Sequence, residues 1–515
     1  MSSASNMMYE CTAGLTQTML ALVTPMILPT ILLLLAWKLW LVHTNMKDPN
    51  SDLPLPPGSM GVPFLGETFT FIMKGADFFR SRSDCYGTVY KTHILGKPTV
   101  RVTGSKNVAK ILEGEGTIVQ TEWPGSTKYL LGEGALAHST GEQHRWRRET
   151  ILKAFNKEAL AGYLPSVQAV CNEYVKEWCK EGSVFGYAAA RSLTFSVAAK
   201  MLLGFDFNDR NKMQMMLLFE DMLASLFSMP VDLPGIGYHK GLKARCAITE
   251  EIESCIQKRT ASGGGKHNDA LALILEATEG GNHMLTKAEI SDSALELLFA
   301  GHLPAASAAC SVLMLLGSNP KIINKVSVEL FDHGLLGIEG EPELTLDILD
   351  KLEYVDCVVK EVLRIAPPVG AGYRKALQTF DIDGCQIPKG WTVVYSIRET
   401  HQSSELFKDG DTFDPDRWRT TLQNQNTKQV VQTDGDEHFN YVPFGWGDRS
   451  CVGQDFSKMM LKVLVVELVR NATWRLTNGT PEMVYMPVPY PKDNLPLQFR
   501  EIPVGFRRRA FTNGW

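Results

Sequence analysis

A long apolar run without charged residues lies near the N-terminus of the chain. Residues 19–36, MLALVTPMILPTILLLLA, contain no Asp, Glu, Lys or Arg. Eighteen residues form about 27 Å of α-helix, which is close to the thickness of the hydrocarbon core of a bilayer. No Lys or Arg precedes the run, whereas a cleaved signal peptide begins with basic residues. The pattern predicts an uncleaved transmembrane helix in preference to a signal peptide or a buried core helix.

The residues after this run indicate its orientation. Trp37 and Trp40 stand where aromatic side chains mark a membrane interface, and Lys38 and Lys47 place the following chain in the cytosol. We therefore predict a lumenal N-terminus and anchor at residues 1–42. The same topology predicts that the sequons at Asn471 and Asn478, which would lie in the cytosol, are not glycosylated.

A proline-rich linker and one large globule follow the anchor. The linker is predicted at residues 43–58, because its LPLPPG run cannot be helical and favours extended chain. Alternating β-rich runs at residues 88–93 and 99–102 predict a small sheet, with another strand at residues 391–395. Helical periodicity dominates residues 142–318. The pattern predicts a globule at residues 59–515 that is mainly α with a minor β region.

Composition narrows the possible partners. The 515 residues include 57 acidic and 52 basic side chains, a formal net charge of −5, which is far from the basic balance of proteins that bind nucleic acid. Nucleic acid is therefore excluded as an expected partner. The ten cysteines form no CxxC pair and no dense cluster, so we predict reduced thiols in a cytosol-facing chain.

One cysteine differs from the other nine by its surroundings. Cys451 lies in the segment 444–453, FGWGDRSCVG, directly before an amphipathic helical run. A thiol at a helix N-terminus faces unpaired N–H groups and the positive end of the helix dipole, which stabilise its thiolate. Gly447 and Gly453 permit close approach of the backbone, and Arg449 offers donors to a carboxylate. The pattern fits a haem whose iron binds the thiolate and whose propionates bind the arginine.

The segment resembles the haem-binding signature of the cytochrome P-450 monooxygenases, through Phe444, Gly447, Arg449, Cys451 and Gly453. Two further segments resemble the same family and precede the cysteine loop in the expected order. Glu361 and Arg364 match its helix-borne Glu-x-x-Arg, and Arg417 matches the arginine that completes that pair. Residues three apart share a helix face, and Arg417 can share the carboxylate, so the set forms a structural triad.

The resemblance covers residues from about 53 to 499 and implies a P-450 fold with residues 59–515 as a haem-thiolate catalytic domain. It implies Cys451 as the metal ligand, NADPH electrons delivered by a partner NADPH-cytochrome reductase, and residence in the endoplasmic reticulum membrane. It also places His144, Arg148 and Arg374 beside Arg449 at the haem propionates. From the sequence alone, His144 fits an ordinary surface histidine equally well.

Shorter stretches resemble the animal retinoic acid hydroxylase subfamily, among them Trp123-Pro124, Pro367-Pro368-Val369 and Asp493-Asn494-Leu495-Pro496. This resemblance implies a retinoid, a small apolar acid, as the substrate. Such a substrate needs an apolar pocket with few polar anchors, and the residues that the resemblance places there are Trp123, Phe227, Phe299 and Val369. Lys97 and Arg101 are the candidates for its carboxylate. Core packing or a surface position explains each of these residues as well.

A capping-box pattern at Thr286 and Glu289 predicts the start of a long apolar helix that runs toward Gly317. The resemblance makes this the helix that crosses the haem, with Gly301 and His302 in its catalytic stretch. The family carries an acid and two threonines directly after that pair, and these groups relay protons during dioxygen activation.

The chain departs from the family at those three positions, which are Leu303, Pro304 and Ala305. Side chains without an exchangeable proton cannot relay protons. Ser307 follows, although the family has a serine there as well. Pro304 also removes a backbone donor and predicts a kink.

Three functions therefore stay open. The first is a retinoid hydroxylase that uses dioxygen and reductase electrons with reduced coupling. The second is a peroxide-using or rearranging haem-thiolate enzyme that needs no external electrons. The third is a retinoid-binding haem protein with little turnover. The apparent retention of the substrate-side stretches favours the first.

Overall fold

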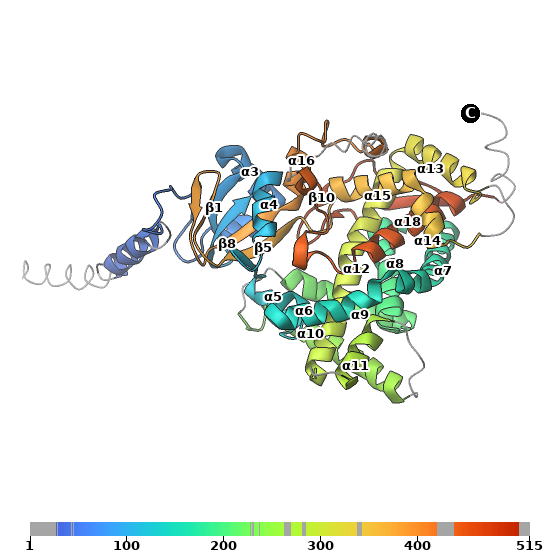
Figure 1. The fold of residues 1–515 in the computed structure, drawn as a ribbon, viewed down its shortest axis with the longest axis horizontal. Coiled ribbons are helices and arrows are strands. Elements are labelled where there is room, and N and C mark those ends of the chain that lie inside the picture. The colour runs from blue at the N-terminus through green and yellow to red at the C-terminus, as the bar shows by residue number, and fades with distance from the viewer. Residues whose placement is uncertain are drawn as a thin grey trace, which may run out of the picture.

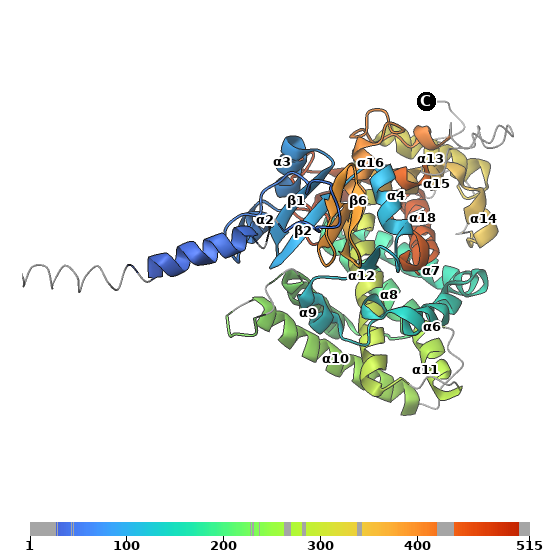
Figure 2. The ribbon, with the colours of Figure 1, turned by 60° about the vertical axis from the view of Figure 1, so that its left-hand side comes forward.

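Strands and helices occupy different parts of the molecule, with a small sheet region beside a larger helical region (Figures 1 and 2). The computed structural model describes residues 27, 29–42, 44, 46–226, 228, 231–235, 237–261, 269–280, 285–336, 342–419 and 437–503. Within those residues, the stretch 142–318 contains one strand, the three-residue β4 (Ser183–Phe185), among its helices. The prediction of a mainly α fold with a minor β region is confirmed.

The helices pack around one large apolar cluster to which α7, α8, α12, α15 and α18 contribute. The described helices after the N-terminal one are α2 (Thr68–Lys74), α3 (Ala76–Tyr86), α4 (Ser105–Glu113), α5 (Gly125–Leu131), α6 (Gly141–Leu152), α7 (Lys157–Glu181), α8 (Gly186–Leu202), α9 (Asp209–Ser225), α10 (Gly237–Ala261), α11 (Ala270–Gly280), α12 (Lys287–Gly317), α13 (Pro320–Asp332), α14 (Leu346–Lys351), α15 (Glu353–Ile365), α16 (Ile397–Ser403) and α18 (Gln454–Asn471).

The main sheet has the order β1-β2-β8-β5-β3. Its strands are β1 (Val89–Ile94), β2 (Lys97–Val102), β3 (Val119–Thr121), β5 (Ala371–Ala376) and β8 (Thr392–Ser396). β1 and β2 are antiparallel, whereas β2 pairs in parallel with β8, from a distant part of the chain. The three strands predicted from the sequence are confirmed within one or two residues at each end.

Smaller sheets complete the β part. One has the order β4-β12-β9, with β9 at Ala472–Leu476 and β12 at Pro496–Glu501. Two hairpins pair β6 (Phe380–Ile382) with β7 (Cys385–Ile387) and β10 (Met483–Val484) with β11 (Tyr490–Pro491). A second apolar cluster lies between the main sheet and α4.

Helix α12 crosses the centre of the molecule (Figure 1). A capping box opens it, because Thr286 Oγ1 accepts the Glu289 N–H at 3.2 Å and the Glu289 carboxylate accepts the Thr286 N–H at 2.9 Å. The predicted start and the predicted end at Gly317 are confirmed. The helix continues through Pro304 without interruption. Among the described residues it is the one helix long and apolar enough to cross a membrane, but 67% of its apolar window is buried, as in a core helix.

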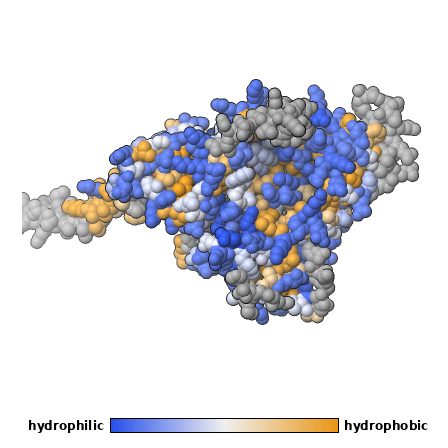
Figure 3. Space-filling view, viewed as in Figure 1, coloured by the Kyte–Doolittle hydropathy of each residue, from blue (hydrophilic) through white to orange (hydrophobic). Residues whose placement is uncertain are grey.

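The N-terminal helix, Pro29–Val42, projects from the sheet end of the molecule (Figure 2). Its surface is apolar (Figure 3), with Leu33 70% exposed and Leu39 63% exposed. Of the predicted span at residues 19–36, the described part is residue 27 and residues 29–36. This part is helical, and most of its side chains are exposed.

Trp40 departs from the expectation of a side chain at a membrane interface. It is 8% exposed, and its ring lies 4.6 Å from the His93 ring and 5.9 Å from the Phe64 ring. Trp37 is 47% exposed, as the expectation required. Trp40 therefore packs the end of the helix against the sheet region, because β1 brings His93 to that position.

Residues 46–58 of the predicted linker contain no helix and are tied to the sheet region. Gln386 donates from Nε2 to the Ser51 carbonyl at 3.1 Å, and its backbone N–H donates to the Pro54 carbonyl at 2.9 Å. The Lys91 N–H donates to the Pro57 carbonyl at 2.8 Å. The linker thus fixes the N-terminal helix relative to β1 and β7.

The sequon at Asn471 lies inside the protein. Its amide nitrogen donates to the backbone carbonyl and to the carboxylate of Glu467, each at 2.9 Å, and the side chain is buried. A buried, hydrogen-bonded amide is not accessible for glycosylation.

Candidate functional site

Cys451 lies at the end of a tight loop that precedes α18. Its backbone N–H donates to the Phe444 carbonyl at 2.9 Å, which closes the loop. Gly447 has φ of +67°, a conformation that favours glycine, and it opens the short helix η4 (Gly447–Arg449). Gly453 has φ of −96°, and a Cβ there would meet Phe155 at 3.9 Å. The backbone conformation of Gly447 therefore requires glycine, whereas the close approach expected at Gly453 stays a prediction.

The surroundings of Cys451 affect its ionisation in opposing ways. Desolvation by the surrounding protein raises the pKa of Cys451, and it outweighs the opposing effects of the Gly453 N–H, Arg148 and Lys458. The side chain is nevertheless exposed. A bound metal cation removes a thiol proton outright, so the thiolate expected from the helix N-terminus stays a prediction for the haem-bound protein.

Arg148 on α6 binds the residue before this cysteine. It donates to the Ser450 carbonyl at 2.6 Å and to Ser450 Oγ at 2.9 Å. Desolvation lowers the pKa of Arg148, and the nearby Cys451 partly offsets this effect. The contact fixes a guanidinium beside the loop from an element about 300 residues away in sequence.

Arg374 on β5 and Arg449 on η4 share one carboxylate. Glu115, after α4, lies 2.7 Å from Arg374 Nε and 3.3 Å from Arg449 Nε. Arg449 also donates to the Ser139 carbonyl at 3.0 Å. Arg374 Nε and the Glu115 oxygen that it faces are buried and are not aligned as a hydrogen bond, so both retain hydrogen-bonding capacity.

His144 on α6 lies near Arg449 and Arg148. It is 7% exposed, so the alternative of a surface histidine is wrong. Desolvation, with Arg449 and Arg148, lowers the pKa of His144 to about 4. The side chain is therefore neutral at pH 7.

These residues fit a haem. The three arginines outnumber the two carboxylates that act on them, Glu115 and Asp448, so the group has spare positive charge for an anion such as a propionate. Cys451 offers an exposed sulfur beside these arginines. No cluster of three or more His, Cys, Asp or Glu side chains suited to a metal occurs in the described part of the chain. The donor set around Cys451 is the one that suits a metal–porphyrin group.

The three members of the structural triad meet around one buried carboxylate. Glu361 accepts two bonds from Arg364 at 2.9 Å each and one from Arg417 at 2.9 Å. Trp418 Nε1 at 2.9 Å and the Asp414 N–H at 3.0 Å complete its hydrogen bonding. Glu361 and Arg364 are fully buried. The carboxylate joins α15 to the chain that leads toward the cysteine loop.

Two of the candidate catalytic residues on α12 face other elements. A Cβ on Gly301 would meet Leu202 at 2.6 Å, so that residue packs against α8. His302 is fully buried, and its Nδ1 lies 3.1 Å from Thr194 Oγ1 on α8. Desolvation lowers the pKa of His302 to about 3. His302 is therefore a neutral core residue.

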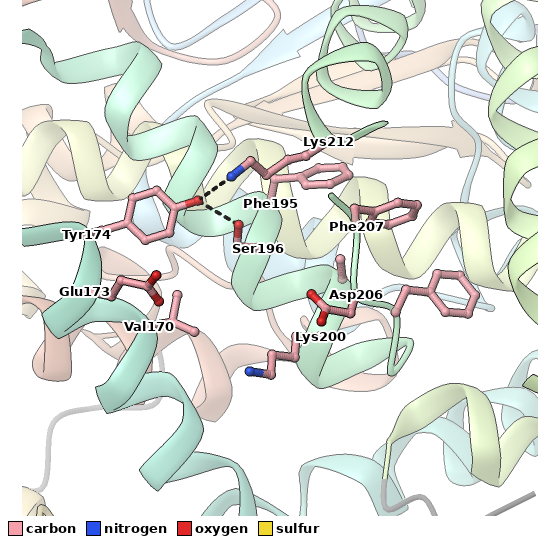
Figure 4. Close-up of a pocket in the computed structure, with 11 residues that line it drawn as sticks. Val170, Glu173, Tyr174, Phe195, Ser196, Lys200, Asp206, Phe207 and Lys212 are labelled. Carbon is pink, nitrogen blue, oxygen red and sulfur yellow. Dashed lines mark hydrogen bonds between the residues drawn. The ribbon is translucent and has the colours of Figure 1, made fainter. Parts of the chain in front are cut away.

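Phe195, which packs against the ring of His302, lines a cavity in the helical region. The two ring centroids lie 5.3 Å apart, and the cavity, of about 160 Å³, lies between α7, α8 and α9 (Figure 4). In this cavity Tyr174 Oη lies 3.1 Å from Lys212 Nζ and 2.8 Å from Ser196 Oγ. None of the residues predicted for the haem or substrate site lines this cavity.

Leu303, Pro304, Ala305 and Ser307 differ in their exposure along α12. Leu303 is 1% exposed, whereas Pro304 and Ala305 are partly exposed. Ser307 is fully buried and donates to the Pro489 carbonyl at 2.6 Å. Its hydroxyl proton is therefore held by a backbone acceptor.

The structure brings two of the candidate substrate-binding residues together. Trp123 and Lys97 line one small cavity of about 30 Å³ beside Tyr373. Phe299 is partly buried against the helical core, Val369 is 36% exposed, and Phe227 lies outside the described residues.

The two candidates for the substrate carboxylate already have partners. Lys97 Nζ lies 2.9 Å from Glu122 at the surface. Arg101 is 4% exposed, donates to Ser396 Oγ at 2.7 Å and lies 3.3 Å from Glu399. Because its positive charge is neutralised inside the protein, Arg101 is the weaker candidate.

Sequence reasoning missed Glu115, Glu296 and His401. Glu115 holds two arginines, and Glu296 accepts backbone N–H bonds from Leu136 and Ala137. His401 joins the triad to the cysteine loop. Glu115 and Glu296 contact residues more than a hundred positions away, and His401 contacts residues a few tens of positions away. No local sequence pattern therefore marks any of the three.

Comparison with known proteins gives consistent matches. The family model described as Cytochrome P450 matches residues 56–498. Cytochrome P450 26A1 of Gallus gallus is 41% identical over 481 residues, 92% of this chain and 96% of that protein. Cytochrome P450 26B1 of Homo sapiens is 41% identical over 477 residues, 91% of each. The solved structure of retinoic acid-bound cyanobacterial CYP120A1 superposes with a TM-score of 0.79 at 35% identity, covering 88% of this chain and 100% of that one.

Proposed function

Because this chain belongs to the cytochrome P450 family, we propose that it is a haem-thiolate monooxygenase that hydroxylates a retinoic acid-like substrate with dioxygen and reductase electrons. The observation that carries the proposal is the convergence of Arg148, Arg374 and Arg449 on the surroundings of Cys451, from three separate elements. A haem, when bound, supplies the dioxygen and redox chemistry that protein side chains lack.

Each residue of the site has a role in this proposal. Cys451 would bind the haem iron, and its loop holds the sulfur at a fixed position through the bond to Phe444. Arg148, Arg374, Arg449 and His144 would hold the propionates, His144 as a neutral donor. The triad of Glu361, Arg364 and Arg417 fixes the surrounding chain.

The substrate assignment rests on relatedness and on two residues that share a cavity. The relatives are cytochromes P450 26A1 and 26B1, and the cyanobacterial structure holds retinoic acid. Trp123 gives the small cavity an aromatic wall, and Lys97 gives it a cation at the rim. We assign Trp123, Phe227, Phe299 and Val369 to the apolar part of the substrate site and Lys97 to the carboxylate.

We also propose that the N-terminal helix anchors the protein in the endoplasmic reticulum membrane, with the catalytic domain in the cytosol. The exposed apolar surface of Pro29–Val42 supports this, since such surface is costly in water. The same location gives access to NADPH-cytochrome reductase.

A difference spectrum on addition of all-trans retinoic acid tests the substrate class. We expect a shift of the haem absorption as the substrate displaces water from the site. Retinoid hydroxylation with NADPH and reductase then tests the reaction. A spectral shift with no turnover from either NADPH or peroxide would support the retinoid-binding protein instead.

One observation favours a second function. Leu303, Pro304 and Ala305 carry no exchangeable proton, which suits an enzyme that uses a peroxide or rearranges its substrate without external electrons. Turnover with a hydroperoxide alone, together with no NADPH-dependent product, would establish it.

A further inference from the structure

The cavity of about 160 Å³ between α7, α8 and α9, here called the α7–α9 cavity, has no role in the proposed reaction (Figure 4). Tyr174 from α7, Ser196 from α8 and Lys212 from α9 line it, together with part of the segment that joins α8 to α9. An apolar cavity of about 150 Å³ holds one benzene molecule. The α7–α9 cavity is therefore large enough for a ligand with a single ring.

Three phenylalanine rings form a run along this cavity, here called the aromatic wall. The ring centroids of Phe195 and Phe207 lie 5.7 Å apart, and those of Phe207 and Phe205 lie 6.0 Å apart. Phe195 is fully buried and Phe205 is 5% exposed. The face of an aromatic ring is negative and attracts organic cations as well as apolar groups. The aromatic wall therefore favours a ligand that is apolar or positively charged.

The polar groups of Tyr174 and Lys212 in this cavity are already bonded to each other. Lys212 Nζ donates to Tyr174 Oη at 3.1 Å, and that hydroxyl lies 2.8 Å from Ser196 Oγ. Lys212 Nζ also lies 3.1 Å from the Asp209 carboxylate. A ligand anion would have to compete with Asp209 for this ammonium group. Lys212 is therefore a poor anchor for an acid.

Two carboxylates at the cavity lack such partners. Glu173 on α7 and Asp206 in the segment between α8 and α9 line the cavity and are exposed. Neither has an ion-pair partner in the described part of the chain. Figure 4 shows both carboxylates turned toward the cavity. Lys200 also lines it, but one cation neutralises one carboxylate at most. At least one carboxylate therefore remains for a positively charged ligand.

We propose that the α7–α9 cavity binds a small apolar amine in its ammonium form. The ammonium group lies at the carboxylates of Glu173 and Asp206, and the apolar group lies against the aromatic wall. Both parts of the ligand then meet the chemistry that the cavity offers to each. This site goes beyond the proposed function, because it involves neither the haem nor the retinoid.

The aromatic wall connects this site to the long helix α12. The ring of Phe195 lies edge-on, 5.3 Å from the ring of His302. The adjacent Thr194 Oγ1 lies 3.1 Å from His302 Nδ1 and 3.2 Å from the His302 carbonyl. A ligand against Phe195 thus supports a side chain that packs α8 on α12. Because the cavity exists only in the folded protein, the bound amine should raise the temperature of unfolding.

Calorimetric titration of the full-length haem protein with benzylammonium tests the ligand class. Benzyl alcohol, which has the same ring without the charge, and benzoate, which has the opposite charge, are the matched probes. We expect one benzylammonium per protein, bound at least about tenfold more tightly than either probe, because hydrogen bonds between charged groups are the stronger ones. Equal binding of the three probes, or tighter binding of benzoate, would overturn the proposed ligand class.

The haem spectrum separates this site from the haem site, because a free amine can also bind haem iron. We expect benzylammonium to leave the haem absorption unchanged and to bind equally well in the presence of all-trans retinoic acid. A spectral shift that accompanies binding, or competition with retinoic acid, would place the ligand beside the haem and overturn the inference. A protein that hydroxylates no retinoid would contradict the proposed function and leave this test unaffected.

Variants locate the bound amine. Glu173→Gln combined with Asp206→Asn removes both charges from exposed positions, so the fold should be retained. We expect this variant to bind benzylammonium at least about tenfold more weakly and to lose the rise in unfolding temperature. Glu177→Gln is the control, since Glu177 is exposed on the next turn of α7 and does not line the cavity. Unchanged affinity in the double variant would overturn the role of the two carboxylates.

Phe207→Leu tests the aromatic wall, because it keeps an apolar side chain and removes one ring. Phe207 is partly buried, so the change should be tolerated. We expect about threefold weaker binding of benzylammonium, the effect of one lost cation–ring contact. Affinity equal to that of the parent would exclude the aromatic wall as part of the site. No heat of binding and no rise in unfolding temperature with millimolar benzylammonium in the parent would overturn the whole inference.

Discussion

The Nε2 atom of His401 accepts the backbone N–H of Val442 at 3.0 Å. Its Nδ1 lies 3.2 Å from the carbonyl of Arg364, so Nδ1 carries the proton and donates it. One buried imidazole therefore joins the helix that holds Glu361 and Arg364 to the chain two residues before Phe444. His401 thus connects the triad to the cysteine loop through two hydrogen bonds.

The stability of this connection should depend on pH through His401. Desolvation lowers the pKa of His401 to about 3 in the folded protein, whereas an unfolded histidine titrates near about 6.5. Between these values only the unfolded chain binds the proton, so stability is full above pH 6.5 and falls as the pH drops, by at most about 1.4 kcal/mol per pH unit. His401→Gln keeps an acceptor and a donor but cannot titrate. Chemical unfolding at pH 5 and pH 7 should show a smaller difference in this variant, and an equal difference would contradict the prediction.

Cys451→Ala should abolish the red-shifted carbon monoxide band of the reduced protein, because no other described cysteine lies among the arginines of the site. Cys85→Ala is the control, since Cys85 is also exposed but lies on α3. Absorption spectra of the reduced, carbon monoxide-treated variants measure the effect. A red-shifted band in Cys451→Ala would exclude this residue as the ligand.

Arg364→Ala should lose haem and folded protein rather than merely slow turnover. It leaves the fully buried carboxylate of Glu361 without its bidentate partner, which typically costs about 3–5 kcal/mol. Denaturant unfolding and haem content measure the loss, with the exposed Arg419→Ala as the control. If Arg364→Ala retained haem and stability, Arg417 would suffice to neutralise Glu361.

The triple change Leu303→Glu, Pro304→Thr and Ala305→Thr should raise the ratio of hydroxylated retinoid to NADPH consumed, because a positioned proton donor is typically worth about 10²–10⁴-fold in rate. Peroxide-driven turnover should change less, since that route does not require dioxygen activation. Both ratios are compared at equal haem content, because removal of Pro304 also restores a helical hydrogen bond. Unchanged coupling would mean that the parent protein already delivers protons efficiently.

The catalytic domain should be digested when protease is added to intact microsomes, because the charge distribution around residues 19–36 places it in the cytosol. Immunoblots with an antibody against the catalytic domain follow the digestion, and a lumenal protein serves as the protected control. A protected catalytic domain would reverse the proposed topology.

Local features of this protein were predictable from the sequence. The capping box at Thr286 and Glu289, the helix after the cysteine loop and the strands β1, β2 and β8 all depend on residues a few positions apart. Hydrogen bonds and side-chain periodicity at that range act on any chain that contains the pattern. The Glu361–Arg364 pair belongs to the same class, because one turn of helix suffices to align it.

The tertiary structure decided which distant groups meet. The sequence could not show that Glu115 lies between Arg374 and Arg449, that Arg101 is already neutralised by Glu399, or that Trp40 packs on His93. These contacts join residues tens to hundreds of positions apart, and their formation depends on how sheet and helices pack. For the same reason the helix N-terminus at Cys451 could not show that Arg148 lies beside the loop or that the assembled protein desolvates the sulfur. The sequence determined which groups are available, and the packing determined their partners and their exposure to water.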